Sequence, residues 1–198
     1  MTTTKIILAG VLGGIAMFIW SSIAHMFLPL RHVGIHELPN EQAVLAAMQT
    51  NLGDKCGLYL FPGLGVGDNP THEQESEAMK HMNEKIASNP SGLLMYYATG
   101  TRSINMGKLL TVEFATELLE AILAVFLLAQ TRIVSFGGRA GFVFVTGILA
   151  AIATNISYWN WYGFPGDYTA SYMLIQIVGF LCTGLVAALV LRSKRLEE

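Results

Sequence analysis

Three glutamates interrupt an otherwise apolar stretch of the chain, at Glu113, Glu117 and Glu120. At 100° per residue these positions fall within about 60° of one another on one face of a helix. A charged side chain at the centre of a bilayer costs roughly 2.5 to 3.5 kcal/mol on insertion scales, so such a stripe must face protein or water. We therefore expect the three carboxylates to face the interior of a helical bundle.

Polar residues in other apolar segments could meet this stripe at a similar depth. The seven residues of the predicted intramembrane pocket are His25, Glu113, Glu117, Glu120, Asn155, Tyr172 and Gln176. One hypothesis is that the pocket binds a proton, a cation, or the polar head of a lipid or quinone. The other is that these groups form hydrogen bonds that only fix the packing of the helices. The sequence leaves both hypotheses open.

The composition indicates that these residues lie in a membrane protein. Hydrophobic residues make up 53% of the 198 residues and charged residues 13%, whereas about a quarter of a soluble domain is charged. About 20 apolar residues cross a bilayer, and four segments have that length: Ile6 to Leu28, Leu109 to Gln130, Ala140 to Tyr162, and Tyr168 to Leu191. We predict a mainly α fold, a four-helix transmembrane bundle with a small α+β extracytoplasmic domain between its first and second helices.

The first apolar segment has a second interpretation, as a cleaved signal peptide. Lys5 precedes it, and Ser22 and Ala24 are small residues of the kind that a signal peptidase requires. Its apolar stretch is longer than a usual signal core, which favours a retained anchor. Gly10 and Gly14 within it form a GxxxG pair, a spacing that lets helix backbones approach closely.

The predicted division of the chain is 1–30 for the first transmembrane helix, 31–108 for the inserted domain, and 109–198 for the remaining three helices and a cytoplasmic tail. The inserted domain contains four of the prolines and eight carboxylates, which indicates an aqueous location. Its expected elements are a helix from Asn40 to Gly53, a strand from Gly57 to Phe61, a helix from Thr71 to about Ala87, and a strand from Gly92 to Tyr97. We expect Asn40 to cap the first helix and Thr71 with Gln74 to form a capping box for the second. Two strands alone are marginally stable, so this domain is expected to need a partner or the membrane helices.

The distribution of basic residues predicts the orientation of the helices. The turn between the second and third apolar segments contains Arg132 and Arg139, and the tail contains Arg192, Lys194 and Arg195. The turn 163–167 between the last two segments contains no basic residue. The positive-inside rule therefore places both termini in the cytoplasm and residues 31–108 outside it.

Aromatic residues cluster around the turn 163–167. Trp159, Trp161, Tyr162 and Phe164 could sit at the level of the lipid headgroups, as aromatic residues do at both membrane surfaces. They could also dock a partner protein, because exposed aromatic side chains beside a rigid proline turn are good binding anchors. The two roles are compatible.

The chain has no recognisable catalytic motif. GxSxG, Walker, dinucleotide-binding and CxxC sequences are absent, and the net charge of −2 provides no basic surface for nucleic acid. His25 is the only histidine in an apolar segment, which excludes a bis-histidine haem within one chain. In the inserted domain, His32 with His36, or Glu73 with Glu77 and His81, could hold a divalent ion, but a solvated surface explains them more simply. We expect no metal and no cofactor. No motif indicates an enzyme, and a metal-dependent membrane enzyme stays open as a third hypothesis.

The order of a first anchor, a GLYLFPG segment, a GLLMYY segment and a WYGFP turn between two spans resembles small uncharacterised bacterial membrane proteins. The resemblance covers most of the chain. It implies a bacterial envelope protein and carries no catalytic residue over to this sequence.

Two functions follow from these observations as hypotheses. The leading one is a non-catalytic accessory or structural subunit of a complex in the bacterial inner membrane, whose partners are the lipid bilayer and other membrane subunits. The alternative is a membrane protein that conducts protons or cations, or binds a lipid or quinone, through the glutamates of its second span.

Overall fold

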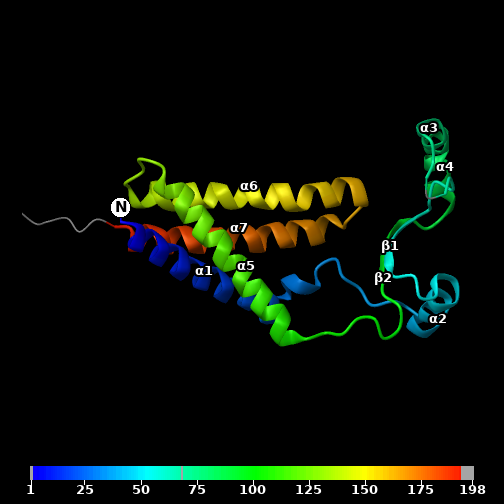
Figure 1. Ribbon diagram of the computed structural model, residues 1–198, viewed down its shortest axis with the longest axis horizontal. Helices are drawn as coiled ribbons and strands as arrows, with labels where there is room; N and C mark the ends of the chain where they lie inside the picture. The colour runs from blue at the N-terminus through cyan, green and yellow to red at the C-terminus, as the bar shows by residue number, and fades with distance from the viewer. Residues whose placement is uncertain (1, 68, 193–198) are drawn as a thin grey trace, which may run out of the picture. The chain divides into compact units, whose positions relative to one another are not determined.

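A computed structural model describes residues 2–67 and 69–192 of the chain. The contacts divide the chain into two compact units. One unit contains Met1–His36 and Asn105–Glu198, and the other contains Glu37–Ile104 (Figure 1).

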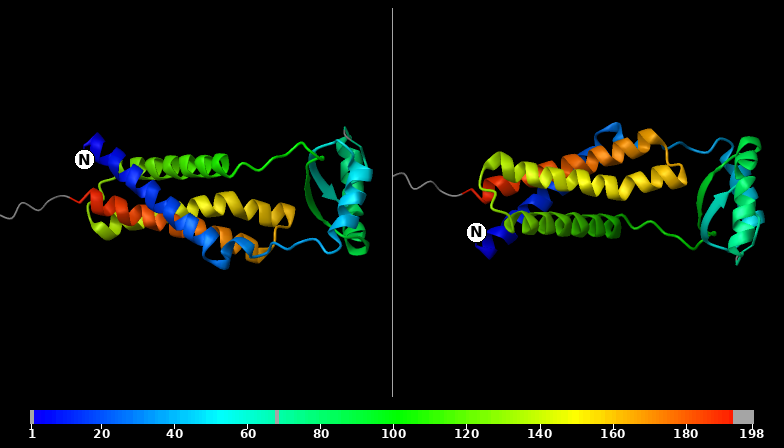
Figure 2. Two further views of the ribbon diagram at one scale, coloured as in Figure 1. Left: turned by 90° about the horizontal axis from the view of Figure 1, so that it is seen from below. Right: turned by 90° about the horizontal axis from the view of Figure 1, so that it is seen from above.

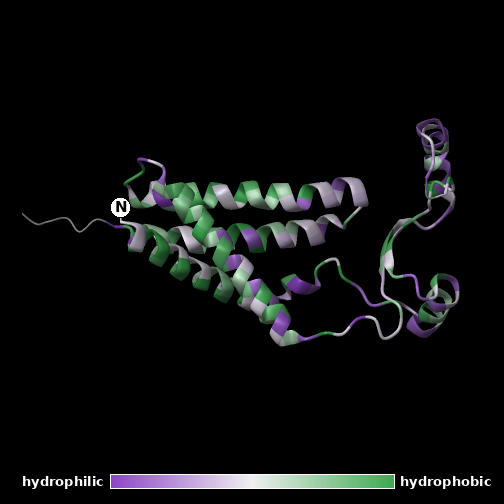
Figure 3. Cartoon of the chain, in the orientation of Figure 1, coloured by the Kyte–Doolittle hydropathy of each residue, from purple (hydrophilic) through white to green (hydrophobic). Residues whose placement is uncertain are grey.

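Four long helices make up the first unit. They are α1 (Thr3–Met26), α5 (Met106–Ala129), α6 (Phe136–Tyr162) and α7 (Gly166–Val190). Within the described residues, α1, α6 and α7 are long and apolar enough to cross a membrane, with mean hydropathies of 2.2, 1.8 and 2.4. The helix α5 has 24 residues but does not join this group, because three glutamates interrupt its apolar sequence (Figure 3). Each helix begins two to four residues before the segment that the sequence predicted, and three of them end one or two residues before it.

The four helices pack in a row rather than in a closed ring. The helix α7 packs along both α6 and α1, and α1 packs in turn along α5, whereas α5 makes only minor contacts with α6 and α7. Figures 1 and 2 show α5 and α6 diverging from the short turn that joins them. The start of α5 is therefore separated from α6.

Glycines allow the close approach of these helices. A Cβ atom on Gly10 would lie 2.8 Å from the Cα of Ile122, and one on Gly14 would lie 2.8 Å from the Cα of Leu118. The GxxxG pair of α1 thus faces the backbone of α5. On another side of α1, the hydroxyl of the buried Thr183 of α7 donates a hydrogen bond of 3.1 Å to the carbonyl of Gly13.

The apolar core lies at the end of the unit that contains the turn between α5 and α6. Its buried residues are Ala9, Met17, Ala124, Val125, Leu128, Val143, Phe180, Ala187 and Leu191. Arg139 closes this end, because its buried guanidinium donates to the carbonyls of Leu191 at 2.6 Å and Ile133 at 3.2 Å. The last carbonyls of a helix have no partner within the helix, so this arginine satisfies one of them at the end of α7.

The second unit consists of short elements. They are α2 (Glu41–Leu52), β1 (Gly57–Phe61), α3 (His72–Lys80), α4 (Met82–Ser88) and β2 (Gly92–Tyr96). The strands pair antiparallel, with Tyr59 opposite Leu94. Among the described residues 37–67 and 69–104, only Ala98 is fully buried, with 3% of its surface exposed. This unit therefore has almost no core of its own.

Two local predictions for this unit are wrong. Asn40 adopts a left-handed conformation, with φ of 51°, and its side chain makes no capping hydrogen bond. The second predicted helix is divided at His81, whose backbone N–H bonds the carbonyl of Ala78 three residues earlier and so leaves the α-helical pattern. The capping box is confirmed, since Thr71 and Gln74 exchange both hydrogen bonds.

Candidate functional site

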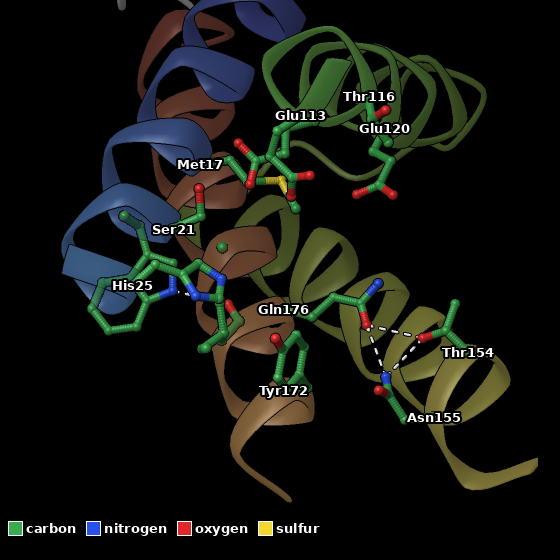
Figure 4. Close-up of a pocket in the computed structure, with 14 residues that line it drawn as sticks. Met17, Ser21, His25, Glu113, Thr116, Glu120, Thr154, Asn155, Tyr172 and Gln176 are labelled. Atoms are coloured by element: carbon green, nitrogen blue, oxygen red, sulfur yellow. Dashed lines mark hydrogen bonds between the residues drawn. The ribbon is translucent and has the colours of Figure 1, made fainter. Parts of the chain in front are cut away.

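A cavity of about 240 Å³ lies among the four long helices. The structure brings all seven residues of the predicted pocket to its walls, from α1, α5, α6 and α7 (Figure 4). Seven further residues complete the lining: Met17, Trp20, Ser21, Thr116, Thr154, Ile175 and Gly179. The structure places these groups together, and their function as a binding site stays a prediction.

The divergence of α5 from α6 creates this space. On α5 the glutamates lie beside the face that meets α1 through Leu118 and Ile122, and α6 contributes Thr154 and Asn155 from another side of the cavity. Glu113, Thr116 and Thr154 are exposed, so the cavity opens between α5 and α6.

Glu117 occupies the buried part of the cavity wall. Only 5% of its surface is exposed, and its Oε2 atom has no hydrogen-bond partner among the described residues. A buried acceptor without a partner costs about 1 to 3 kcal/mol, and more if it is charged. Native proteins rarely leave such a group unsatisfied, and an ordered water, a bound ion, local strain or a functional role accounts for the exceptions.

The α6 and α7 sides of the cavity are joined by a polar cluster. Gln176 Oε1 lies 3.1 Å from the hydroxyl of Thr154 and 3.3 Å from the amide nitrogen of Asn155 (Figure 4). The Asn155 amide also donates to the carbonyl of Ala151 at 3.0 Å. These bonds hold the amides of α6 and α7 together on the side away from Glu117.

The wall formed by α1 and α7 is fixed by aromatic groups. The indole N–H of Trp20 donates to the carbonyl of Ile175 at 2.9 Å. The rings of His25 and Tyr172 lie 5.9 Å apart, tilted by 58°. These contacts fix the orientation of both α1 residues.

A second cavity of about 260 Å³ adjoins the first, because Thr154 and Asn155 line both. Its other walls include Tyr158, Phe164 and Tyr168. The ring centroids are 5.4 Å apart between Tyr158 and Phe164, 5.6 Å between Phe164 and Tyr168, and 4.5 Å between Tyr168 and Tyr172. Since Tyr172 lines the first cavity, a continuous row of aromatic rings connects the two.

This aromatic row is the part of the site that sequence reasoning missed. The signal was the i, i+4 spacing of Tyr168 and Tyr172 together with the turn that returns Phe164 to Tyr158. Of the predicted docking residues, Trp159, Trp161 and Tyr162 are 49%, 78% and 44% exposed. Phe164 is half-buried within the row, so its position differs from that of the other three.

Within the described residues, no three histidine, cysteine or carboxylate side chains are grouped so that they could hold a metal ion. The lining of the first cavity contains three carboxylates and one histidine but neither lysine nor arginine. In comparisons with known proteins, no family model, no curated protein and no solved structure matches this chain.

Proposed function

We propose that this chain is a four-span membrane protein that binds the polar head of a membrane-soluble ligand in the cavity lined by Glu117. The observation that carries the proposal is Glu117, a residue of the cavity lining whose buried Oε2 atom has no partner among the described residues. A ligand that donates a hydrogen bond to this atom would remove the cost of leaving it unsatisfied.

The packing of α5 supports its inclusion as the fourth span. It approaches α1 at two glycine positions, and α1 is apolar enough to cross the bilayer. Its outward side chains are large and apolar, with Leu119, Leu123 and Phe126 each more than half exposed in the isolated chain. Such a surface suits lipid, whereas Glu117 is buried against protein and Glu120 is half-buried.

The packing of α1 supports the anchor over the signal peptide. It lies between α5 and α7, which make few contacts with each other. Removal of α1 would therefore leave α5 without its main packing partner. The basic residues Arg132, Arg139 and Arg192 support an orientation with both ends of the helical unit in the cytoplasm, and Lys194 and Arg195 lie outside the described residues. The resemblance of the sequence to small bacterial membrane proteins is the basis on which we propose a bacterial inner membrane as its location.

Binding is better supported than conduction of protons or cations. On the cytoplasmic side of the cavity the four helices are filled mainly by buried apolar groups, among them Val125, Leu128 and Phe180. Conduction needs a hydrated or polar path across the membrane, and these residues interrupt one within the chain.

The exposed opening between α5 and α6 provides a direct test. Phenylalanine in place of Thr116, an exposed lining residue, is expected to fill the cavity and exclude the ligand. Thr111→Phe is the matched control, because Thr111 is also exposed on α5 and, like Thr116, donates to the carbonyl four residues earlier, but does not line the cavity.

The measurement is native mass spectrometry of protein released from native-lipid nanodiscs. The parent protein and Thr111→Phe should retain a small molecule that Thr116→Phe loses. Equal retention in all three proteins, or no bound molecule on the parent, would contradict the proposal.

A role as an accessory or structural subunit is the second candidate. The scarcity of buried residues in the unit Glu37–Ile104 favours this role. Among the described residues of the unit only Ala98 is fully buried, so contact with a partner would supply the burial that the unit lacks. Co-purification from mild detergent tests it, and a monodisperse lone monomer would count against it.

A further inference from the structure

We infer that the ligand of this cavity is an organic cation that carries N–H donors, such as a primary ammonium group, and that it enters along the row of aromatic rings. The inference rests on the proposed function, because it names the chemical class of the molecule that the Glu117 cavity binds. Three independent features support it: charge, hydrogen-bonding capacity and the adjoining aromatic cavity.

The charge of the lining favours a cation. Glu113, Glu117 and Glu120 contribute three carboxylates, and none of the lining residues is a lysine or arginine. Buried charges in proteins are paired or neutralised. A cationic ligand would supply the counter-charge that the described lining residues do not.

Several donors of the cavity wall are used within the protein. The indole of Trp20 donates to the carbonyl of Ile175, the hydroxyl of Ser21 to that of Phe18 at 3.1 Å, and the hydroxyl of Thr116 to that of Val112 at 2.9 Å. The Asn155 amide is occupied by Ala151 and Gln176. The three carboxylates of the lining can accept hydrogen bonds from a ligand, and when ionised they have no donor of their own.

An ammonium group matches these acceptors, since it has three N–H donors and no acceptor. A quinone head presents carbonyl oxygens, which only accept hydrogen bonds, so it would face carboxylates that it cannot satisfy. A bare metal ion is also a poor match, because the described carboxylate and histidine groups do not form a metal-binding cluster.

The aromatic row gives the cation a route into the cavity. A cation within about 6 Å of an aromatic ring face is attracted to it. The aromatic residues Tyr158, Phe164 and Tyr168 line the second cavity, and Tyr172 lines the first, so aromatic side chains accompany the path between the two cavities. The volume of about 240 Å³ is below the ~300 to 1,000 Å³ of sites that enclose a drug-sized ligand, which indicates that the first cavity takes the ammonium head alone.

The test uses the full chain in nanodiscs made of a choline lipid, which has no N–H donor. The probes are dodecylamine, dodecyltrimethylammonium, dodecanol and a short-chain ubiquinone, and the readout is the fluorescence of the protein's tryptophans, one of which, Trp20, lines the cavity. Dodecylamine, which is protonated at neutral pH, should bind at least about tenfold more tightly than the other three, because a hydrogen bond between charged groups contributes roughly 1.5 to 3 kcal/mol.

Glu117→Gln should weaken dodecylamine binding by about tenfold or more. Glu120→Gln, on the same cavity wall, is a second variant in case Glu117→Gln does not fold. It should also weaken dodecylamine binding, by less than Glu117→Gln does. Thr111→Phe provides the control for effects of the amine on the bilayer, and it should bind dodecylamine as the parent does.

Equal binding of dodecyltrimethylammonium, dodecanol or ubiquinone, or unchanged dodecylamine binding in both glutamine variants, would overturn the inference. If Thr116→Phe still loses a co-purifying molecule in that case, the cavity binds a ligand of another class and the proposed function survives. If dodecylamine binds as expected, competition identifies the source of the ammonium group. Displacement of dodecylamine by nanodiscs containing phosphatidylethanolamine supports a lipid headgroup, and displacement by ethylamine in the buffer supports a small soluble amine.

Discussion

Glu117 is a residue whose cost to the fold is most easily explained by a ligand. On α5, Glu113 is exposed and Glu120 is half-buried. Glu117 is 5% exposed, and its Oε2 atom has no hydrogen-bond partner among the described residues. A leucine at this position would pack against α1 without that cost. A buried carboxylate oxygen without a partner is the kind of local exception to polar satisfaction that is expected at functional sites.

Cys56 in the unit Glu37–Ile104 is a second residue with an unusual environment. Its exposed Sγ atom lies 3.4 Å from the hydroxyl of Thr101 and accepts a hydrogen bond of 3.2 Å from the backbone N–H of Ala98. These contacts lower the pKa of the Cys56 thiol, with the Thr101 hydroxyl as the larger cause.

A lowered pKa makes Cys56 reactive at a lower pH, because the thiolate is the nucleophile. Thr101→Val removes the hydroxyl and should raise the pKa, so the curve of alkylation rate against pH should move to higher pH and the rate near neutral pH should fall. The measurement is the rate of iodoacetamide labelling across pH, in a Cys182→Ser background that leaves Cys56 as the only thiol.

Thr50→Val is the matched control for this prediction. Thr50 is an exposed threonine of the same unit, and its hydroxyl bonds the carbonyl of Ala46 in α2. Its replacement should leave the pH profile of Cys56 unchanged. A profile that Thr101→Val does not move would show that this hydroxyl has no influence on the thiol.

The glutamate stripe could be predicted from the sequence because helical spacing alone places the three residues on one face. The residues opposite the stripe were predictable only by depth, since Asn155, Tyr172 and Gln176 come from helices whose rotation a sequence does not give. The row from Tyr158 to Tyr172 was not predicted, because it depends on the turn at Gly163, whose φ of 69° returns Phe164 toward α6.

At the scale of the elements, small residues determine how closely the helices pack. The Cβ positions of Gly10 and Gly14 meet the backbone of α5, and that of Gly184 meets the carbonyl oxygen of Ala140 at 2.9 Å. Backbone atoms cannot move aside as the end of a flexible side chain can. These positions therefore fix the distances of α1 from α5 and of α7 from α6.

The same substitution should have opposite effects at two helical glycines. Gly14→Ala is expected to destabilise the protein by about 1 to 3 kcal/mol, because the added methyl group overpacks the contact with Leu118. Gly141→Ala in α6 is the control, since a Cβ there meets nothing within 4 Å, and it should stabilise the helix by up to about 1 kcal/mol. Thermal unfolding in one detergent measures both, and an unchanged or raised stability of Gly14→Ala would mean that α1 and α5 are not packed through Gly14.

The positions of the elements were largely predictable, whereas two of their boundaries were not. Long apolar runs end where lipid ends, and the β-rich runs at 57–61 and 92–96 are bounded by turn residues, so both kinds of element are marked in the sequence. The break at His81 and the left-handed Asn40 involve only local hydrogen bonds of similar energy. No spacing pattern distinguishes those alternatives.

At the scale of the whole molecule, α5 determines the topology. The helices α1, α6 and α7 satisfy the length and hydropathy of membrane spans, and α5 is set apart from them by the carboxylates that line the cavity. If α5 crosses the membrane, the segments before and after it lie on opposite sides. If it does not, they lie on the same side. The number of spans and the location of the cavity in the membrane are thus one question.

Two single-cysteine proteins answer it. In Cys182→Ser, the remaining thiol is the exposed Cys56, which precedes α5 in the chain. In Val134→Cys combined with Cys56→Ser and Cys182→Ser, the thiol lies in the turn after α5, at a position whose native side chain is 80% exposed. A membrane-impermeant maleimide applied to intact spheroplasts should label Cys56 and should reach position 134 only after the membrane is permeabilised. Labelling of both sites, or of neither, before permeabilisation would mean that α5 does not cross the membrane and that the chain has three spans. The glutamates of α5 would then lie outside the hydrocarbon, where water can solvate a carboxylate and no cationic ligand is required.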